Sequence, residues 1–120
     1  MSVDFRQLFP AVQRRPSMYV LDGRFLTLVA YVDGCDTATG GALLRGFKDW
    51  LYATRVGSGQ TSVGWPGVLE FARGLYEERE PLRELTNEES EQLIDDTFQA
   101  LDEFLASHDH VFAVTTPTGT

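Results

Sequence analysis

The apolar residues between positions 87 and 107 recur with the 3.6-residue period of an α-helix, and this pattern constrains the fold most strongly. One side of that helix would carry Leu93, Ile94, Phe98, Leu101, Phe104 and Leu105. Thr86 and Glu89 have the spacing of a capping box, in which each side chain accepts a hydrogen bond from the other residue's backbone N–H. We therefore predict a helix over about 87–107 whose apolar side packs into the core.

The same period marks shorter segments earlier in the chain. Helices are predicted over about 3–14, 24–38, 42–55 and 66–76. Pro66 suits the first turn of its helix, because proline lacks the N–H that would be unpaired there. Pro16 ends the first helix, and residues 17–22 are expected to be a short extended piece.

Strand patterns are nearly absent from the sequence. Residues 108–114 are compatible with a short strand or with a tail. A chain of 120 residues, 42% of them hydrophobic, has the size and apolar content of one ordinary domain. The predicted fold is all-α, a single compact bundle of about five helices over residues 1–112, with a flexible C-terminal tail at 113–120.

Charge is distributed unevenly along the chain, whose formal net charge is −8. Residues 77–109 contain twelve acidic and two basic side chains, whereas residues 1–76 contain six acidic and eight basic ones. A nucleic-acid-binding protein needs a basic footprint for phosphates, so the acidic half argues against that class. The asymmetry is compatible with a basic protein partner, or with a surface that only maintains solubility.

The single cysteine, Cys35, excludes an intramolecular disulfide. Asp4 and Arg6 interrupt the N-terminal region, so a signal peptide is not expected. The apolar stretches are too short for a membrane span, and no membrane association is predicted. These features together predict a cytoplasmic protein; nothing in the sequence indicates an oligomeric state.

No group of residues has the pattern of a catalytic, cofactor or metal site. His108 and His110 lie near the C-terminus without the spacing of zinc ligands, and Cys35 occupies the apolar side of a predicted helix. The acidic pairs at 95–96 and 102–103 are expected on the polar, solvated side of a helix, whereas general-acid chemistry needs a partly buried carboxyl group. The sequence therefore predicts a non-enzymatic protein without a cofactor or bound metal.

The outer side of the last predicted helix is a candidate partner-binding surface. Its carboxylates are Glu88, Glu91, Asp95, Asp102 and Glu103, several of which recur at intervals of four or seven residues. A second candidate surface consists of Tyr19, the Gly- and Ser-rich segment 57–64, and Trp65. Core packing is the default interpretation for both Trp50 and Trp65, and a recognition role for Trp65 is the alternative.

Residues 12–22, VQRRPSMYVLD, resemble the N-terminal signature of the DNA gyrase B and topoisomerase ATPase family. The following segment, FLTLVAYVDGCDTA at 25–38, is similar to the start of that family's ATP-site helix. The family uses a glutamate to polarise water and an asparagine to hold magnesium, whereas this helix offers Asp33 and Asp36 around Gly34. We therefore expect no ATPase activity.

A second resemblance extends over about residues 5–105. Small bacterial proteins of polymorphic-toxin and related conflict loci carry R-P-x-M-Y, F-x-x-W-L and S-x-x-W motifs before an acidic C-terminal helix. The chain has these motifs in the same order, at 15–19, 47–51 and 62–65, although Ser17 replaces the usual glycine. The resemblance implies a non-enzymatic immunity protein that neutralises a toxin by binding it.

These observations leave three functional hypotheses. The leading one is a protein-binding domain of immunity type, whose acidic surface recognises a basic toxin domain. The second is a small regulatory or scaffold subunit of a bacterial complex that uses the same helical surface. The third, an ATPase fragment or an unknown hydrolase, lacks support from any residue pattern.

Overall fold

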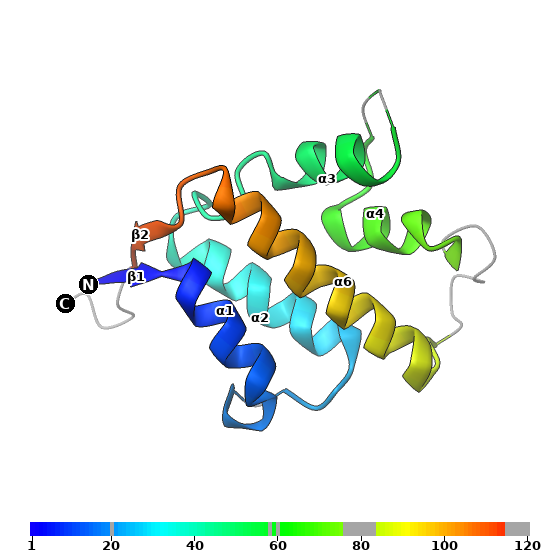
Figure 1. The fold of residues 1–120 in the computed structure, drawn as a ribbon, viewed down its shortest axis with the longest axis horizontal. Helices are drawn as coiled ribbons and strands as arrows, with labels where there is room; N and C mark the ends of the chain where they lie inside the picture. The colour runs from blue at the N-terminus through cyan, green and yellow to red at the C-terminus, as the bar shows by residue number, and fades with distance from the viewer. Residues whose placement is uncertain (20, 58, 60, 76–83, 115–120) are drawn as a thin grey trace.

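The computed structural model of the protein describes residues 1–19, 21–57, 59, 61–75 and 84–114. Within these ranges the fold is compact and largely helical, and one small two-stranded sheet joins its ends (Figure 1). The elements, in chain order, are β1 (Ser2–Asp4), α1 (Phe5–Arg14), the 3₁₀-helix η1 (Pro16–Tyr19), α2 (Phe25–Ala38), α3 (Phe47–Arg55), α4 (Trp65–Ala72), α6 (Asn87–Ala106) and β2 (Val111–Ala113). The prediction of a largely helical fold is confirmed, but the sheet means that the fold is not purely α-helical.

Helix α6 lies at the centre of the molecule and forms as its sequence predicts. Thr86 Oγ1 accepts a hydrogen bond from the Glu89 backbone N–H at 3.1 Å, and the Glu89 carboxylate accepts one from the Thr86 backbone N–H at 2.8 Å. This confirms the capping box. The helix contacts α1 and α2 on one side and α3 and α4 on the other (Figure 1).

The core collects the apolar sides of all these helices around α6. Its fully buried large side chains include Phe25, Phe47, Phe104, Leu28, Leu43, Leu51, Leu69, Leu93, Leu101 and Leu105. Three α6 residues from the predicted apolar side, Leu93, Leu101 and Leu105, have no measurable exposure. Burial of this kind contributes about 1.5–3 kcal/mol per large side chain, so the packing around α6 dominates the stability of the fold.

The short sheet pairs the two ends of the described chain. Strands β1 and β2 are antiparallel, with Val3 opposite Phe112. The Val114 backbone N–H donates to the Met1 carbonyl at 2.9 Å, and the Phe5 N–H donates to the His110 carbonyl at 2.8 Å. Residue 113, where the sequence predicts a tail to begin, lies within β2; residues 115–120 are outside the described part.

Other departures from the predicted boundaries have local causes. Pro16–Tyr19 forms a 3₁₀-helix where an extended segment was predicted. Helix α3 begins at Phe47 instead of about 42, because Gly46 adopts a left-handed conformation with φ of 80°. Helix α4 ends at Ala72, shortly before Gly74, whose φ of 75° is also left-handed and ends α-helical geometry. Most of the predicted linker 77–85 lies outside the described residues.

Candidate functional site

The carboxylates of α6 point in two directions. Each residue of an α-helix is rotated by about 100° from the previous one, so positions 88, 91, 95 and 102 share a side while 96 and 103 do not. In the structure, Asp95 and Asp102 line a groove beside α1, whereas Asp96 and Glu103 contact arginines of α4 and α3. The predicted single stripe is therefore divided, and Glu103 lies on the other side of the helix.

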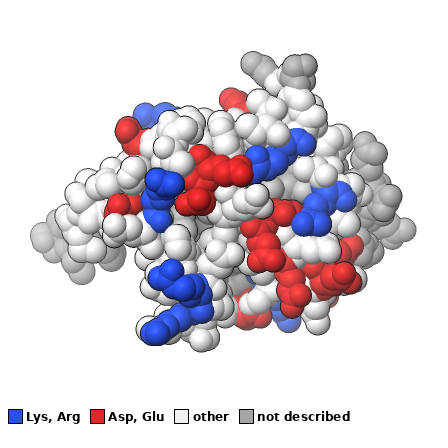
Figure 2. Space-filling view, viewed as in Figure 1, with Lys and Arg blue, Asp and Glu red and all other residues white. Residues whose placement is uncertain are grey.

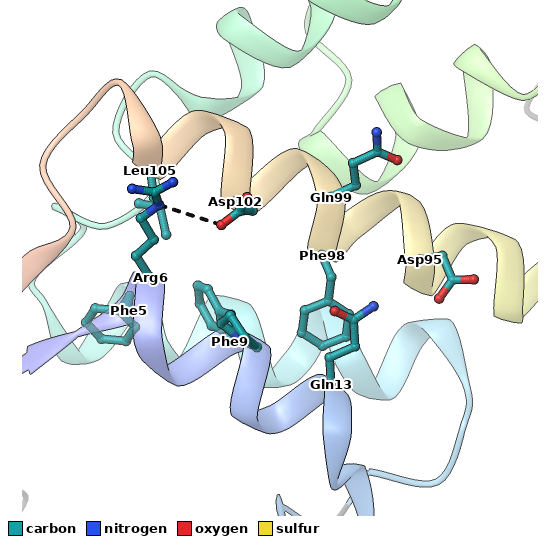
Figure 3. A pocket seen from close by; sticks show the side chains of 10 residues that line it. Phe5, Arg6, Phe9, Gln13, Asp95, Phe98, Gln99, Asp102 and Leu105 are labelled. Carbon is teal, nitrogen blue, oxygen red and sulfur yellow. Dashed lines mark ion pairs between the residues drawn. The ribbon is translucent and has the colours of Figure 1, made fainter.

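The groove runs between α1 and α6 and has a volume of about 470 Å³ (Figure 3). Its α1 wall is formed by Phe5, Arg6, Phe9, Pro10 and Gln13, and its α6 wall by Asp95, Phe98, Gln99, Asp102 and Leu105. Phe9 and Phe98 lie between the two helices at its floor, where they are 3% and 6% exposed. Carboxylates therefore stand directly beside an apolar floor.

A second hollow of about 320 Å³ continues the groove toward the start of α2. It is lined by Gln13, Pro16, Leu21, Gly23, Arg24, Leu28, Glu91, Ile94 and Asp95. Gln13 and Asp95 line both hollows, which therefore adjoin along α6, and we call the two together the α6 groove. Its acidic residues are Glu91, Asp95 and Asp102.

One ion pair crosses the α6 groove. Arg6 Nε lies 3.6 Å from Asp102 Oδ1, and their side chains are 46% and 57% exposed (Figure 3). Exposed pairs of this kind contribute only about 0–1 kcal/mol, because water and salt screen them. Asp102 is therefore held by Arg6 but remains accessible to another cation.

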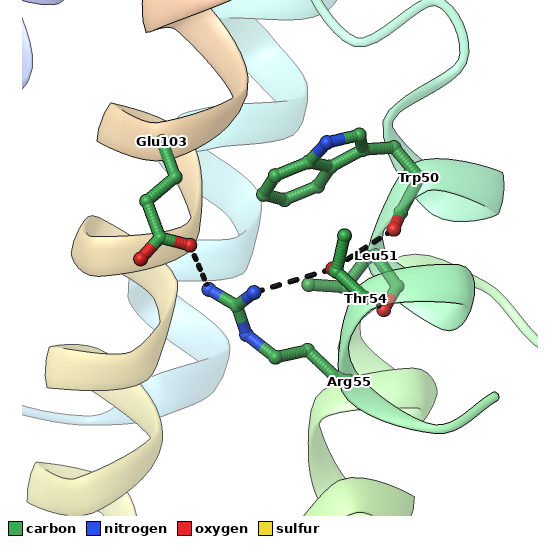
Figure 4. Close-up of polar contacts among 5 residues, drawn as sticks. All are labelled: Trp50, Leu51, Thr54, Arg55 and Glu103. Carbon is green, nitrogen blue, oxygen red and sulfur yellow. Dashed lines mark hydrogen bonds and ion pairs between the residues drawn. The ribbon is translucent and has the colours of Figure 1, made fainter.

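The opposite side of α6 is occupied by two stronger ion pairs. Arg55 Nη2 lies 2.5 Å from Glu103 Oε2, and the Arg55 guanidinium carbon lies 5.4 Å from the centre of the Trp50 ring (Figure 4). Arg73 binds Asp96 through two nitrogens, and this hydrogen bonding raises the pKa of the Arg73 guanidinium. These two pairs, which we call the arginine clamp, join α3 and α4 to α6.

The remaining predicted carboxylates have no such partners. Glu88, Glu91 and Asp95 are exposed, and none of them forms an ion pair with another described residue. Figure 2 shows the acidic side chains gathered over α6 on this face, with basic side chains to either side. In the N-terminal half of the α6 groove, Glu91 and Asp95 thus stand outside the described ion pairs, with Arg24 lining the same hollow.

In the second candidate surface, Tyr19 and Trp65 pack against the rest of the fold, and Trp65 takes the core position that was its default interpretation. Trp65 is only 7% exposed, and its indole N–H donates to Asp33 Oδ1 at 2.9 Å. Its ring packs against Phe25 and Phe47, so Trp65 is a core residue in this structure. Tyr19 is half-buried against Tyr31, with ring centres 6.2 Å apart. Two positions of the 57–64 segment, 58 and 60, lie outside the described residues.

Three other side chains that could take part in chemistry, those of Cys35, Tyr31 and His108, make packing contacts within the fold. Burial raises the pKa of the Cys35 thiol, and burial together with Cys35 raises the pKa of Tyr31 to about 12, so both groups stay protonated at neutral pH. His108 stacks on Phe104, and its Nδ1 lies 2.8 Å from the Phe104 carbonyl oxygen. No cluster of three or more metal-ligating side chains occurs in the described ranges.

The gyrase-like segment also uses its acidic residues in hydrogen bonds within the fold. Asp33 accepts from the Trp65 indole, and Asp36 Oδ1 accepts from the Leu44 backbone N–H at 2.9 Å. Both carboxylates thus fix the position of neighbouring segments against α2.

Comparison of the chain with protein-family models gives no match, and comparisons with curated proteins and with solved structures give none either. No helix within the described residues is long and apolar enough to cross a bilayer. Sequence reasoning missed the α1 wall of the groove and the three arginines that bind α6. Their pairing joins residues at least 23 positions apart, for which no local pattern gives a signal.

Proposed function

We propose that the protein is a non-catalytic binding domain of immunity type, which neutralises a basic toxin domain in the cytoplasm. The observation that carries this proposal is the α6 groove, where the exposed Glu91 and Asp95 form no ion pair with a described residue and stand beside apolar side chains. The resemblance to conflict-locus proteins supports the same assignment.

Both properties of the groove suit the capture of a protein. Negative charge accelerates the approach of a basic partner and discourages acidic ones, including nucleic acids. Phe9 and Phe98 are already nearly buried, so the apolar surface that a partner could remove from water is that of the partly exposed Leu21 and Ile94. An immunity protein needs only a rigid scaffold and such a complementary surface, and the packed core around α6 supplies the scaffold.

The test begins with the genes beside the one that encodes this chain. The proposal predicts that a large secreted toxin is encoded directly upstream. Its toxic domain, expressed in the cytoplasm of a heterologous bacterium, should arrest growth, and coexpression of this chain should restore growth. A matched variant, Glu91→Lys with Asp95→Lys, should restore growth poorly although it folds normally.

The result also separates the alternatives. If the wild-type chain binds the neighbouring domain directly but does not restore growth, a regulatory or scaffold role is favoured. If it neither binds nor protects, the immunity proposal is wrong.

A further inference from the structure

We draw no further inference here: the strongest candidate, the exposed apolar patch that Leu26, Ala30 and Gly34 form along the outer side of α2, is a helix face on which nothing in the described part of the structure shows what covers it.

Discussion

On the side of α6 that faces α3 and α4, Asp96 and Glu103 are each paired with an arginine, whereas on the groove side Glu91 and Asp95 form no ion pair with a described residue. The two sides belong to one helix and carry the same chemical groups. They differ in what the rest of the chain places opposite them. The arginine clamp faces one side, and an apolar groove with a single weak pair faces the other.

This difference separates two uses of negative charge. Carboxylates in the arginine clamp hold α3 and α4 in place, so part of the acidic character of residues 77–109 is balanced by the basic residues of the first half. Carboxylates in the α6 groove contribute little to the described packing, and like charges on one helix side repel each other slightly. Their surroundings therefore suit recognition better than folding.

The largest expected effect concerns the groove floor. Phe98→Ala removes a ring that is 94% buried, and we expect it to lower the free energy of unfolding by about 3–5 kcal/mol. Urea denaturation measures the change. Gln99→Ala, at the exposed neighbouring position, should alter stability by no more than about 0.5 kcal/mol. A loss near zero for Phe98→Ala would mean that this side of α6 does not pack on α1 as described.

A smaller effect is expected when charge in the groove is reversed. Asp95→Lys with Asp102→Lys should leave the fold intact, because both side chains are exposed and only the weak pair with Arg6 is lost. The rate of association with the proposed partner, a basic toxin domain, should fall at least about tenfold at low salt. Added salt should slow wild-type association, since charges are screened beyond about 8–10 Å. If the double variant associates as fast as the wild type, the groove charges do not take part in binding and serve only solubility.

The arginine clamp should contribute measurably but modestly to stability. A double-mutant cycle with Arg73→Gln and Asp96→Asn should give a coupling energy of about 0.2–1 kcal/mol, the range for partly exposed pairs. By contrast, Glu91→Gln should leave stability unchanged or raise it by a few tenths of a kcal/mol, because it relieves repulsion. Denaturant titrations of these variants test the contrast. If Glu91→Gln destabilised the protein and the clamp showed no coupling energy, the groove side would be the structural one, contrary to the roles assigned here.

No effect at all is expected from ATP. Asp33 and Asp36 are already engaged by Trp65 and Leu44, and the glutamate and asparagine of the gyrase family are missing. Titration calorimetry with Mg-ATP should give no heat of binding, and no phosphate should be released. Micromolar binding would revive the ATPase-fragment hypothesis and move the functional site from α6 to α2.

The predictable parts of the fold were those determined by neighbouring residues. The capping box at Thr86 and the proline at 66 define helix starts through contacts a few residues away, and both starts agree with the structure. The β1–β2 pair was not predictable, because two three-residue strands from opposite ends of the chain carry no pattern of their own. Single left-handed glycines such as Gly46 shortened helices whose apolar period continued past them.

The candidate site could be predicted only in part, because local patterns do not show which distant elements pack against α6. Spacing along one helix correctly groups Asp95 and Asp102, which line the same groove. It does not reveal that Glu103 turns toward Arg55, because that contact depends on an element distant in the chain. The α1 wall of the groove arises from packing between the first and last helices, and no local pattern signals it.

The central claim, that the two sides of α6 divide recognition from structure, is tested most directly by two charge-matched variants. Glu91→Gln with Asp95→Asn alters the α6 groove, and Asp96→Asn with Glu103→Gln alters the arginine clamp; each removes two negative charges. The measurement is the association rate with the basic toxin domain at low salt. We predict that the groove variant associates about tenfold more slowly while the clamp variant stays close to the wild-type rate. Equal slowing in both variants, or slowing in the clamp variant alone, would contradict the division.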